Sequence, residues 1–240
     1  MNSHSFLTSS NQQNNHYKFV ALPTMNGQKQ KANDDKKSAV GDSYLRSSAL
    51  RFAQQGNYTE AIALLNQLIQ RHPHNAVDFN NRGLIYFQSG EMEKAVRDYN
   101  IALRLNPKLA SAYNNRANYY AACGELAAAL TDYDQAIDLN PSYVRAWINR
   151  GITLRDLGQY EQAIENFDIV LLFGQLEGHI WAERGRTYHI WGDWNCAIAD
   201  YRRALIQLPG VDNKRDVPGY RLRLQLENWL NELVPSHPEL

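Results

Sequence analysis

The sequence predicts an all-α protein in which helix–turn–helix repeats stack into one array. Three residue types recur at a step of 34 residues. Proline keeps this step at Pro73, Pro107, Pro141 and Pro209, and Gln175 fills the missing place. Glycine and alanine keep it at Gly56, Gly90, Gly124, Gly158, Gly192, Ala61, Ala95, Ala129, Ala163 and Ala197. A fixed period of this length is typical of helical repeat arrays, because each repeat buries its apolar faces only against its neighbours.

The period divides most of the chain into five repeats. Their bounds are 42–75, 76–109, 110–143, 144–177 and 178–211. In the second repeat, apolar residues at helical spacing begin at Phe79 and resume at Met92. Gly90 between them suits the left-handed residue that ends a helix, and Pro107 stops the second helix. Each repeat is therefore predicted to hold two amphipathic helices of about 12 to 14 residues.

Small and large residues of the period predict how the two helices of a repeat pack. Minimal side chains recur in the first helices, at Gly83, Ala117, Gly151 and Gly185. Aromatic side chains recur in the second helices, at Tyr99, Tyr133, Phe167 and Tyr201. We expect the small residues to let the paired helices approach closely, and the rings to fill holes in the adjoining surface.

Both ends of the chain fall outside the period. Residues 1–41 are rich in Asn, Gln, Ser and Lys and bury too little apolar surface to offset their ordering entropy, so we expect a disordered tail. A short docking motif at residues 17–20 is the alternative. In residues 212–240, one apolar stripe from Leu222 to Leu233 predicts a helix that caps the array. Alternatively, Trp229 docks a partner or a second copy of the chain.

The composition narrows the possible functions. Lys plus Arg and Asp plus Glu number 25 each, and a net charge of zero gives no long-range attraction to polyanions. Cys123 and Cys196 lie in different repeats at different places, which predicts reduced thiols rather than a disulfide or metal ligands. We find no apolar run of membrane-spanning length and no signal-peptide pattern. We therefore expect a cytoplasmic protein.

Several short motifs resemble tetratricopeptide repeats. They are the runs 80–83, 114–117 and 148–151, the run 132–137, and Leu-Asn-Pro at 105–107 and 139–141. The resemblance covers residues 42–211 and is weakest in two places: Ser48 replaces arginine in the first repeat, and Gln175 replaces proline in the fourth. It implies an α–α superhelix whose concave groove is lined by the first helix of each repeat and binds an extended peptide.

The resemblance also names the residues of this peptide-binding groove. They are Asn80, Asn81, Asn114, Asn115, Asn118, Arg145, Asn149, Arg155 and Arg186. An asparagine amide carries both a donor and an acceptor, so Asn81, Asn115 and Asn149 are expected to pair with a peptide main chain. The alternative is that these amides satisfy neighbouring helices. The arginines favour an acidic segment, although Glu183 argues against a clamp for a terminal carboxylate.

Two further patterns leave alternatives open. Arg82, Arg116, Arg150 and Arg184 are followed 16 residues later by Asp98, Asp132, Asn166 and Asp200. This spacing predicts charge-assisted hydrogen bonds between the two helices of a repeat, with phosphate binding as the alternative. Near Gln175, Leu172 stands where the second and third repeats have Arg104 and Asp138. Leu172 and Phe173 predict either an exposed contact patch or local repacking of the turn.

Together these patterns predict a non-catalytic adaptor that binds a segment of another protein. We recognise no phosphate loop, metal-spaced His/Cys cluster or nucleophile elbow, so we expect no enzyme activity, cofactor, metal or small-molecule substrate. One alternative is an assembly factor for a membrane-bound complex. Another is weak nucleic-acid binding through arginines and the tail lysines Lys29, Lys31, Lys36 and Lys37. Self-association and the identity of the partner stay open.

Overall fold

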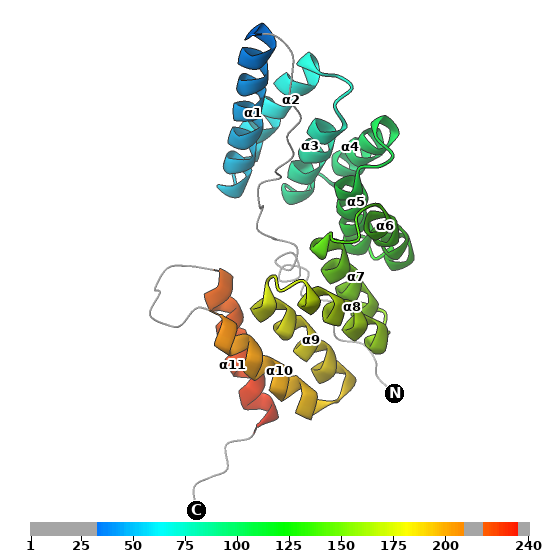
Figure 1. The fold of residues 1–240 in the computed structure, drawn as a ribbon, viewed down its shortest axis with the longest axis vertical. Coiled ribbons are helices and arrows are strands. Elements are labelled where there is room, and N and C mark those ends of the chain that lie inside the picture. The colour runs from blue at the N-terminus through cyan, green and yellow to red at the C-terminus, as the bar shows by residue number, and fades with distance from the viewer. Residues whose placement is uncertain (1–32, 209–217, 235–240) are drawn as a thin grey trace, which may run out of the picture. The chain divides into compact units, whose positions relative to one another are not determined.

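The computed structural model describes residues 33–208 and 218–234, which form eleven α-helices and no strand (Figure 1). The helices are α1 Asn33–Gln54, α2 Tyr58–Arg71, α3 Ala76–Gln88, α4 Met92–Leu105, α5 Ala110–Ala122, α6 Leu126–Leu139, α7 Val144–Asp156, α8 Tyr160–Leu172, α9 Glu177–Trp191, α10 Trp194–Gln207 and α11 Pro218–Leu233. The chain divides into two compact units, residues 1–106 and 107–240. We call them the N-terminal unit and the C-terminal unit.

The predicted repeats correspond to consecutive helix pairs. The pairs α1 and α2, α3 and α4, α5 and α6, α7 and α8, and α9 and α10 each pack side by side. Apart from α1, the helices of these pairs are 13 to 15 residues long. The all-α class and the five helix–turn–helix repeats are therefore confirmed.

Helix α1 begins earlier than the sequence predicted. It starts at Asn33, inside the segment 1–41 that was expected to be a disordered tail. Residues 33–41 contain no proline and include lysine and alanine, which favour helix, so the helix extends beyond the apolar pattern that predicted it. Residues 1–32 lie outside the described residues, and the tail and its docking motif stay predictions there.

The glycine within each repeat has the conformation that its place required. Gly56, Gly90, Gly124, Gly158 and Gly192 have φ angles between 76° and 95°. A Cβ atom at any of the five would have no neighbour within 4 Å. The backbone angle, rather than lack of space, therefore explains why glycine recurs at these turns.

Small residues of the first helices pack against large residues of the second helices, as predicted. A Cβ added to Gly83 would lie 2.8 Å from two ring carbons of Tyr99. The same atom at Gly185 would lie 2.8 Å from the ring of Tyr201. Both tyrosine side chains are fully buried. At Gly83 and Gly185 the paired helices are therefore close enough for a Cβ to meet the ring, whereas in the third repeat Ala117 packs in one core cluster with Tyr133.

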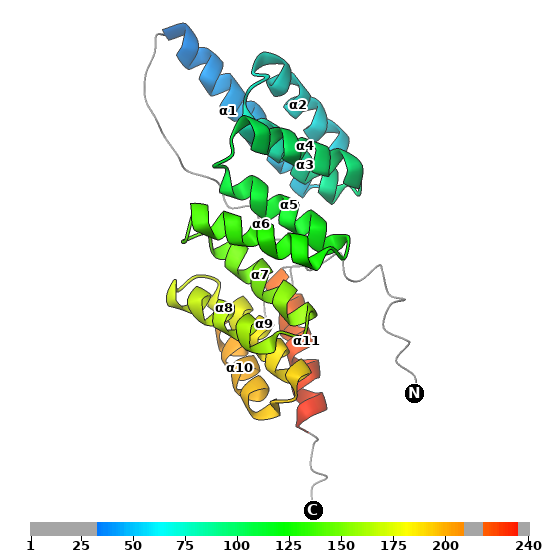
Figure 2. The ribbon, with the colours of Figure 1, turned by 90° about the vertical axis from the view of Figure 1, so that its right-hand side faces the viewer.

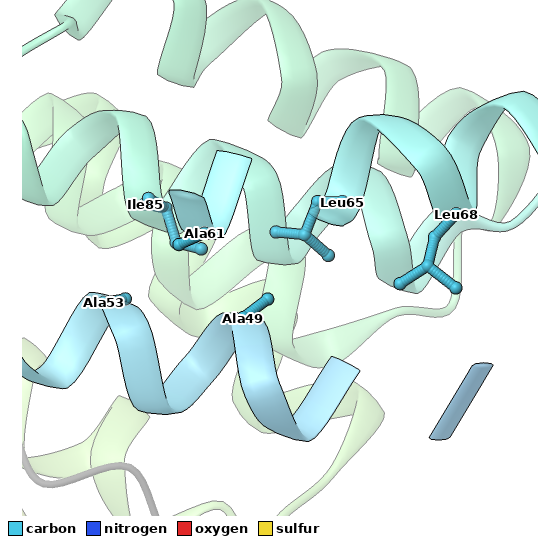
Figure 3. Close-up of a cluster of buried hydrophobic side chains, with 6 residues drawn as sticks. All are labelled: Ala49, Ala53, Ala61, Leu65, Leu68 and Ile85. Carbon is cyan, nitrogen blue, oxygen red and sulfur yellow. The ribbon is translucent and has the colours of Figure 1, made fainter. Parts of the chain in front are cut away.

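The degenerate first repeat builds a core of the same kind. Ala49 and Ala53 of α1 face Ala61, Leu65 and Leu68 of α2, and Ile85 of α3 completes the cluster (Figure 3). All six side chains are buried. Replacement of the usual arginine by Ser48 therefore leaves the packing of this repeat intact.

Helix α11 covers the end of the C-terminal unit, as the capping interpretation predicted. It contacts α10, and α9, α10 and α11 lie together at the C-terminal end of this unit (Figure 1, Figure 2). Leu226 is fully buried, and the ring of Trp229 stacks 5.4 Å from the ring of Tyr201. Arg223 adds a contact that the sequence did not predict: its Nη2 donates to the carbonyl oxygen of Leu208 over 2.9 Å. This bond satisfies one of the carbonyls that the end of a helix leaves without a partner.

The turn that contains Gln175 departs from the other repeats. Gly174 has a φ of 62° and Leu176 a φ of 56°, and Leu176 is the one non-glycine residue with positive φ among those described. Leu172 is 87% exposed, Phe173 38% and Leu176 44%. Both alternatives for this segment therefore hold in part: the turn is rebuilt, and its apolar side chains face solvent.

Candidate functional site

The asparagines expected to line a groove in the C-terminal unit form a buried amide cluster between α5 and α7. Asn114, Asn115 and Asn149 are 2%, 8% and 3% exposed. Asn149 Nδ2 donates to Asn114 Oδ1 over 3.2 Å and to Asn118 Oδ1 over 3.0 Å. Asn114 Nδ2 in turn donates to Asn115 Oδ1 over 3.3 Å. For Asn114 and Asn149, these bonds favour the alternative in which the amides connect neighbouring helices.

One edge of this cluster is more accessible. Asn118 is half-buried, and its Oδ1 also accepts a hydrogen bond of 2.6 Å from the hydroxyl of Tyr133 on α6. Two donors therefore fix the orientation of the Asn118 amide. Within the described residues, Asn149 Oδ1 is buried without a donor, a situation that typically costs about 1–3 kcal/mol. The cluster thus combines an oriented amide with an unsatisfied acceptor.

Arg155, also expected in the groove, is instead paired inside the array. It is 9% exposed, and its Nη1 lies 2.7 Å from Glu183 Oε2, so the pair joins α7 to α9. Burial lowers the pKa of the Arg155 guanidinium, but the nearby Glu183 carboxylate outweighs this and raises that pKa above its ordinary value. Arg155 therefore brings no free positive charge to a groove.

The nine expected groove residues divide by burial. Five are buried: Asn80, Asn114, Asn115, Asn149 and Arg155. Four are partly exposed: Asn81, Asn118, Arg145 and Arg186. The buried five differ from the expectation of solvent-facing side chains. The reason is visible in the C-terminal unit, where these side chains lie in the seams between consecutive first helices.

The arginine ladder is structural, as the first interpretation predicted. Arg82 Nε and Nη2 donate to the two carboxylate oxygens of Asp98 over 2.7 and 2.8 Å. Arg116 makes the same two-bond contact with Asp132, at 2.7 and 2.9 Å. In each case the arginine belongs to the first helix of a repeat and the carboxylate to the second. Two parallel bonds fix the geometry of such a pair as well as its energy.

A second partner of these arginines was missed. Arg82 Nη1 also donates to Asn66 Oδ1 over 2.7 Å, and Asn66 lies 16 residues before it, in the preceding repeat. Arg184 likewise bonds to Asp168 as well as to Asp200. Burial lowers the pKa of the Arg184 guanidinium, but its bonds to the two carboxylates outweigh this and raise that pKa well above its ordinary value. The ladder therefore joins repeats as well as the helices within them.

Arg150 keeps the ladder in an altered form. Its Nε lies 2.6 Å from Asp134 Oδ1 of the preceding repeat, and its Nη1 donates to Asn166 Oδ1 over 3.2 Å. Asparagine at position 166 offers one oxygen where the other repeats offer a carboxylate, so the strong partner changes to the preceding repeat.

Aromatic rings flank the ladder arginines. The guanidinium of Arg82 lies 5.5 Å from the ring centroid of Phe79 and 5.7 Å from that of Tyr86. Arg184 lies 4.5 Å from the Trp181 ring and 5.8 Å from the Tyr188 ring. The signal for these contacts is present in the sequence as aromatic residues three places before and four places after the arginine.

Other site chemistries find no support in the part of the chain that the structure describes. No cluster of three or more His, Cys, Asp or Glu side chains there could hold a metal ion. Cys123 and Cys196 are free thiols. Across 33–208 and 218–234, no helix has the length and apolar character needed to cross a membrane.

Comparison with known sequences identifies the repeats. Models of the tetratricopeptide repeat match residues 42–75 and 144–168, and a model described as a TPR repeat matches residues 83–122 and 117–154. Together the matches cover half of the chain. The chain belongs to the tetratricopeptide repeat family. No curated protein sequence matches this TPR protein.

Solved structures share the TPR fold. A thermophilic TPR protein from Thermus thermophilus aligns with a TM-score of 0.67 at 18% identity, covering 79% of this chain and 98% of its own. PilW, a type IV pilus biogenesis factor, aligns at 0.65 with 19% identity and covers 82% and 94%. A tetratricopeptide repeat protein from Parabacteroides merdae aligns at 0.59 with 22% identity and covers 80% and 74%. At these identities the likeness establishes the fold alone.

Membership of the tetratricopeptide repeat family indicates the general role of this TPR protein. Tetratricopeptide repeats generally mediate protein–protein interactions, and the repeat fold is generally a non-catalytic scaffold. The accessible polar side chains of the first helices are therefore the candidate site for a protein partner.

Proposed function

We propose that this TPR protein is a non-catalytic adaptor that binds an extended segment of a partner protein along α5, α7 and α9. Asn118, Arg145 and Arg186 are partly exposed and belong to these three helices. Asn118 and Arg186 occupy equivalent positions of the third and fifth repeats. The equivalent position of the fourth repeat is Ile152, and Arg145 lies seven residues before it. Residues seven apart share a helix face, so we define these three side chains as the first-helix row.

The orientation of Asn118 is the observation that carries the proposal. Its oxygen accepts bonds from Tyr133 and Asn149, which directs the Nδ2 group to the remaining side of the amide. Among the described residues, that Nδ2 group has no acceptor. A half-buried donor held in place in this way suits the carbonyl oxygen of an extended main chain, because little ordering entropy is lost on binding.

The charges of the row indicate what kind of segment it binds. Arg145 and Arg186 are partly exposed cationic side chains, and the guanidinium of Arg186 lies over the Trp229 ring. Arg155 forms an ion pair with Glu183. A segment with Asp or Glu side chains is therefore favoured over a basic one. Such binding weakens as salt rises, since charges on a partly exposed surface are screened.

The experiment that tests this proposal uses N118D. Aspartate keeps the oxygen that Tyr133 and Asn149 bond, but replaces the Nδ2 donor with a second acceptor. Affinity capture from a lysate with the full chain, followed by mass spectrometry, is compared between wild type, N118D and Q162E. Gln162 lies exposed on the second helix α8, so Q162E adds the same charge away from the row. Partners lost with N118D and kept with Q162E support the proposal; equal recovery with all three proteins contradicts it.

The alternative functions are an assembly factor for a membrane-bound complex and weak nucleic-acid binding. An assembly factor for a membrane-bound complex would use the same binding of a protein segment, so the N118D comparison applies to it as well. Nucleic-acid binding has less support, because the ladder arginines bond to carboxylates inside the array. Lys29 and Lys31 lie outside the described residues. A cytoplasmic location stays a prediction.

A further inference from the structure

A depression with two exposed tryptophans lies at the turn between α9 and α10. Trp191, Gly192, Asp193, Trp194 and Asn195 line it. The side chain of Trp191 is 44% exposed and that of Trp194 is 61% exposed. Gly192 contributes no side chain between the two indoles. Exposure of a large indole ring to water is unfavourable, so two exposed rings at one turn indicate a candidate binding surface.

The repeat register explains why Trp194 is uncovered. Trp191 ends the first helix of its repeat, and Tyr160 begins the second helix of the repeat before, with ring centroids 6.1 Å apart. Trp194 stands in its own repeat where Tyr160 stands in the fourth. The capping helix packs through Leu226 and Trp229 on other residues. Within the described residues, Trp194 consequently has no ring contact, hydrogen bond or cation.

Other tryptophans of the C-terminal unit show what an indole face holds in this protein. The guanidinium of Arg184 lies 4.5 Å from the ring centroid of Trp181, and Arg203 lies 4.9 Å from the same ring. The guanidinium of Arg186 lies 4.5 Å from the Trp229 ring. Arginine over indole is thus the recurring arrangement, and it is favourable by about 0.5–2 kcal/mol depending on exposure.

The depression carries the negative charge of Asp193, which attracts a cation. Asp193 caps α10, and its Oδ1 accepts a hydrogen bond of 3.0 Å from the main-chain nitrogen of Cys196. This bond fixes the carboxylate at the rim of the depression. Among residues 41–208 and 219–234, no Lys, Arg or His pairs with Asp193. An anionic group would meet both the carboxylate and the negative ring faces, whereas a cation is attracted by both.

We propose that this depression binds the guanidinium group of an arginine on a partner polypeptide, between the indoles of Trp191 and Trp194 and beside Asp193. The site lies outside the first-helix row and does not depend on the function proposed above. It would give the protein a contact with a basic residue of a partner at the turn edge of the last repeat, separate from the first-helix row. Two linked contacts strengthen binding beyond either one alone.

The test uses the indole N–H signals of the full, ¹⁵N-labelled chain, which contains five tryptophans. The probe is an acetylated and amidated Gly-Ser-Arg-Ser-Gly peptide, titrated at constant ionic strength. Its comparison is the same peptide with citrulline, which keeps the shape of arginine but is neutral. We expect saturable shifts of the Trp191 and Trp194 signals with the arginine peptide, and roughly fivefold weaker binding of the citrulline peptide.

Three variants sharpen the test. W194A removes the more exposed ring, and D193N removes the charge while asparagine still caps α10. Each should weaken binding of the arginine peptide by roughly fivefold. E125Q is the matched control, because Glu125 precedes α6 as Asp193 precedes α10. It should bind like wild type.

Several results would overturn the proposal. Equal shifts with the arginine and citrulline peptides would show apolar docking without recognition of charge. Shifts with choline chloride but not with the arginine peptide would indicate a lipid-type headgroup as the ligand. Unchanged affinity in D193N, or shifts confined to the Trp147, Trp181 and Trp229 signals, would place the contact elsewhere.

Discussion

Arg82 and Asp98 form a two-bond ion pair between α3 and α4, with Nε and Nη2 of the arginine 2.7 and 2.8 Å from the two carboxylate oxygens. The Asp98 side chain is almost fully buried. Arg82 also reaches Asn66 of the preceding repeat. One side chain thus fixes three helices of the N-terminal unit relative to one another.

Removal of Arg82 should therefore destabilise the protein strongly. R82M leaves the Asp98 carboxylate buried without its partner, which we expect to cost about 3–5 kcal/mol. The double variant R82M/D98N should lose less than the sum of the two single variants, because the carboxylate is no longer charged. Urea unfolding followed by circular dichroism measures both. R97M, at an exposed arginine of α4, is the control and should change stability little. Equal losses in R82M and R97M would contradict the structural role of the ladder.

Gly83 should not tolerate even one added methyl group. In G83A the new Cβ would lie 2.8 Å from the Tyr99 ring and 3.1 Å from the carbonyl oxygen of Ala95. The helices must shift apart, which we expect to cost about 1–3 kcal/mol in thermal or urea unfolding. G41A is the matched control within α1, where a Cβ meets nothing within 4 Å. It should stabilise by about 0.5–1 kcal/mol, since alanine is the better helix former. A neutral G83A would show that the pair is not tightly packed.

Replacement of Leu176 by glycine should stabilise the protein. Leu176 holds a left-handed φ of 56° at the turn before α9, and its side chain is 44% exposed. L176G relieves backbone strain of about 1–2 kcal/mol, and it removes a side chain that lies outside the buried core. L172G provides a comparison of opposite sign, because Leu172 is also exposed but lies in the last turn of α8, where glycine weakens the helix by about 1 kcal/mol. A fall in melting temperature for L176G would contradict the strain argument.

The first repeat should lose stability in acid through Asp42. Burial raises the pKa of the Asp42 carboxyl, but its hydrogen bonds with His72 and Arg71 outweigh this and lower that pKa below the ordinary 3.8. The contribution of Asp42 to the free energy of unfolding is therefore fully present above about pH 3.8. It is lost as the pH falls through the lower pKa that this carboxyl has in the folded protein. D42N should flatten this part of the stability curve in urea unfolding between about pH 6 and pH 3. An unchanged acid slope in D42N would assign the effect to other carboxyls.

The sequence was sufficient for the architecture of the repeats because their determinants are local. Gly90 specifies a left-handed turn, and Gly83 and Tyr99 specify a close contact between helices of one repeat. Each of these features acts over 16 residues or fewer, and the 34-residue step repeats it. The extent of α1 was missed because no repeated feature marks the start of the first repeat.

The candidate site was predicted less well, since exposure depends on the neighbouring repeat. The sequence predicts that Asn118 and Asn149 lie on first helices. It does not predict on which side of the seam between α5 and α7 each amide lies. The bond from Arg82 back to Asn66 was missed for the same reason, because it crosses from one repeat to the one before. The capping bond of Arg223 to the end of α10 depends on a helix outside the period.

The binding role of the first-helix row is tested most directly by the affinity of a captured partner segment for N118D, measured by calorimetry beside wild type and Q162E. Loss of one well-oriented hydrogen bond from a bound main chain is expected to cost about 1.4 kcal/mol, which is roughly tenfold in Kd. We predict that N118D weakens binding by about this factor, with an unchanged melting temperature, and that Q162E binds as tightly as wild type. Equal Kd values for wild type and N118D would contradict the assignment of the first-helix row as the binding site.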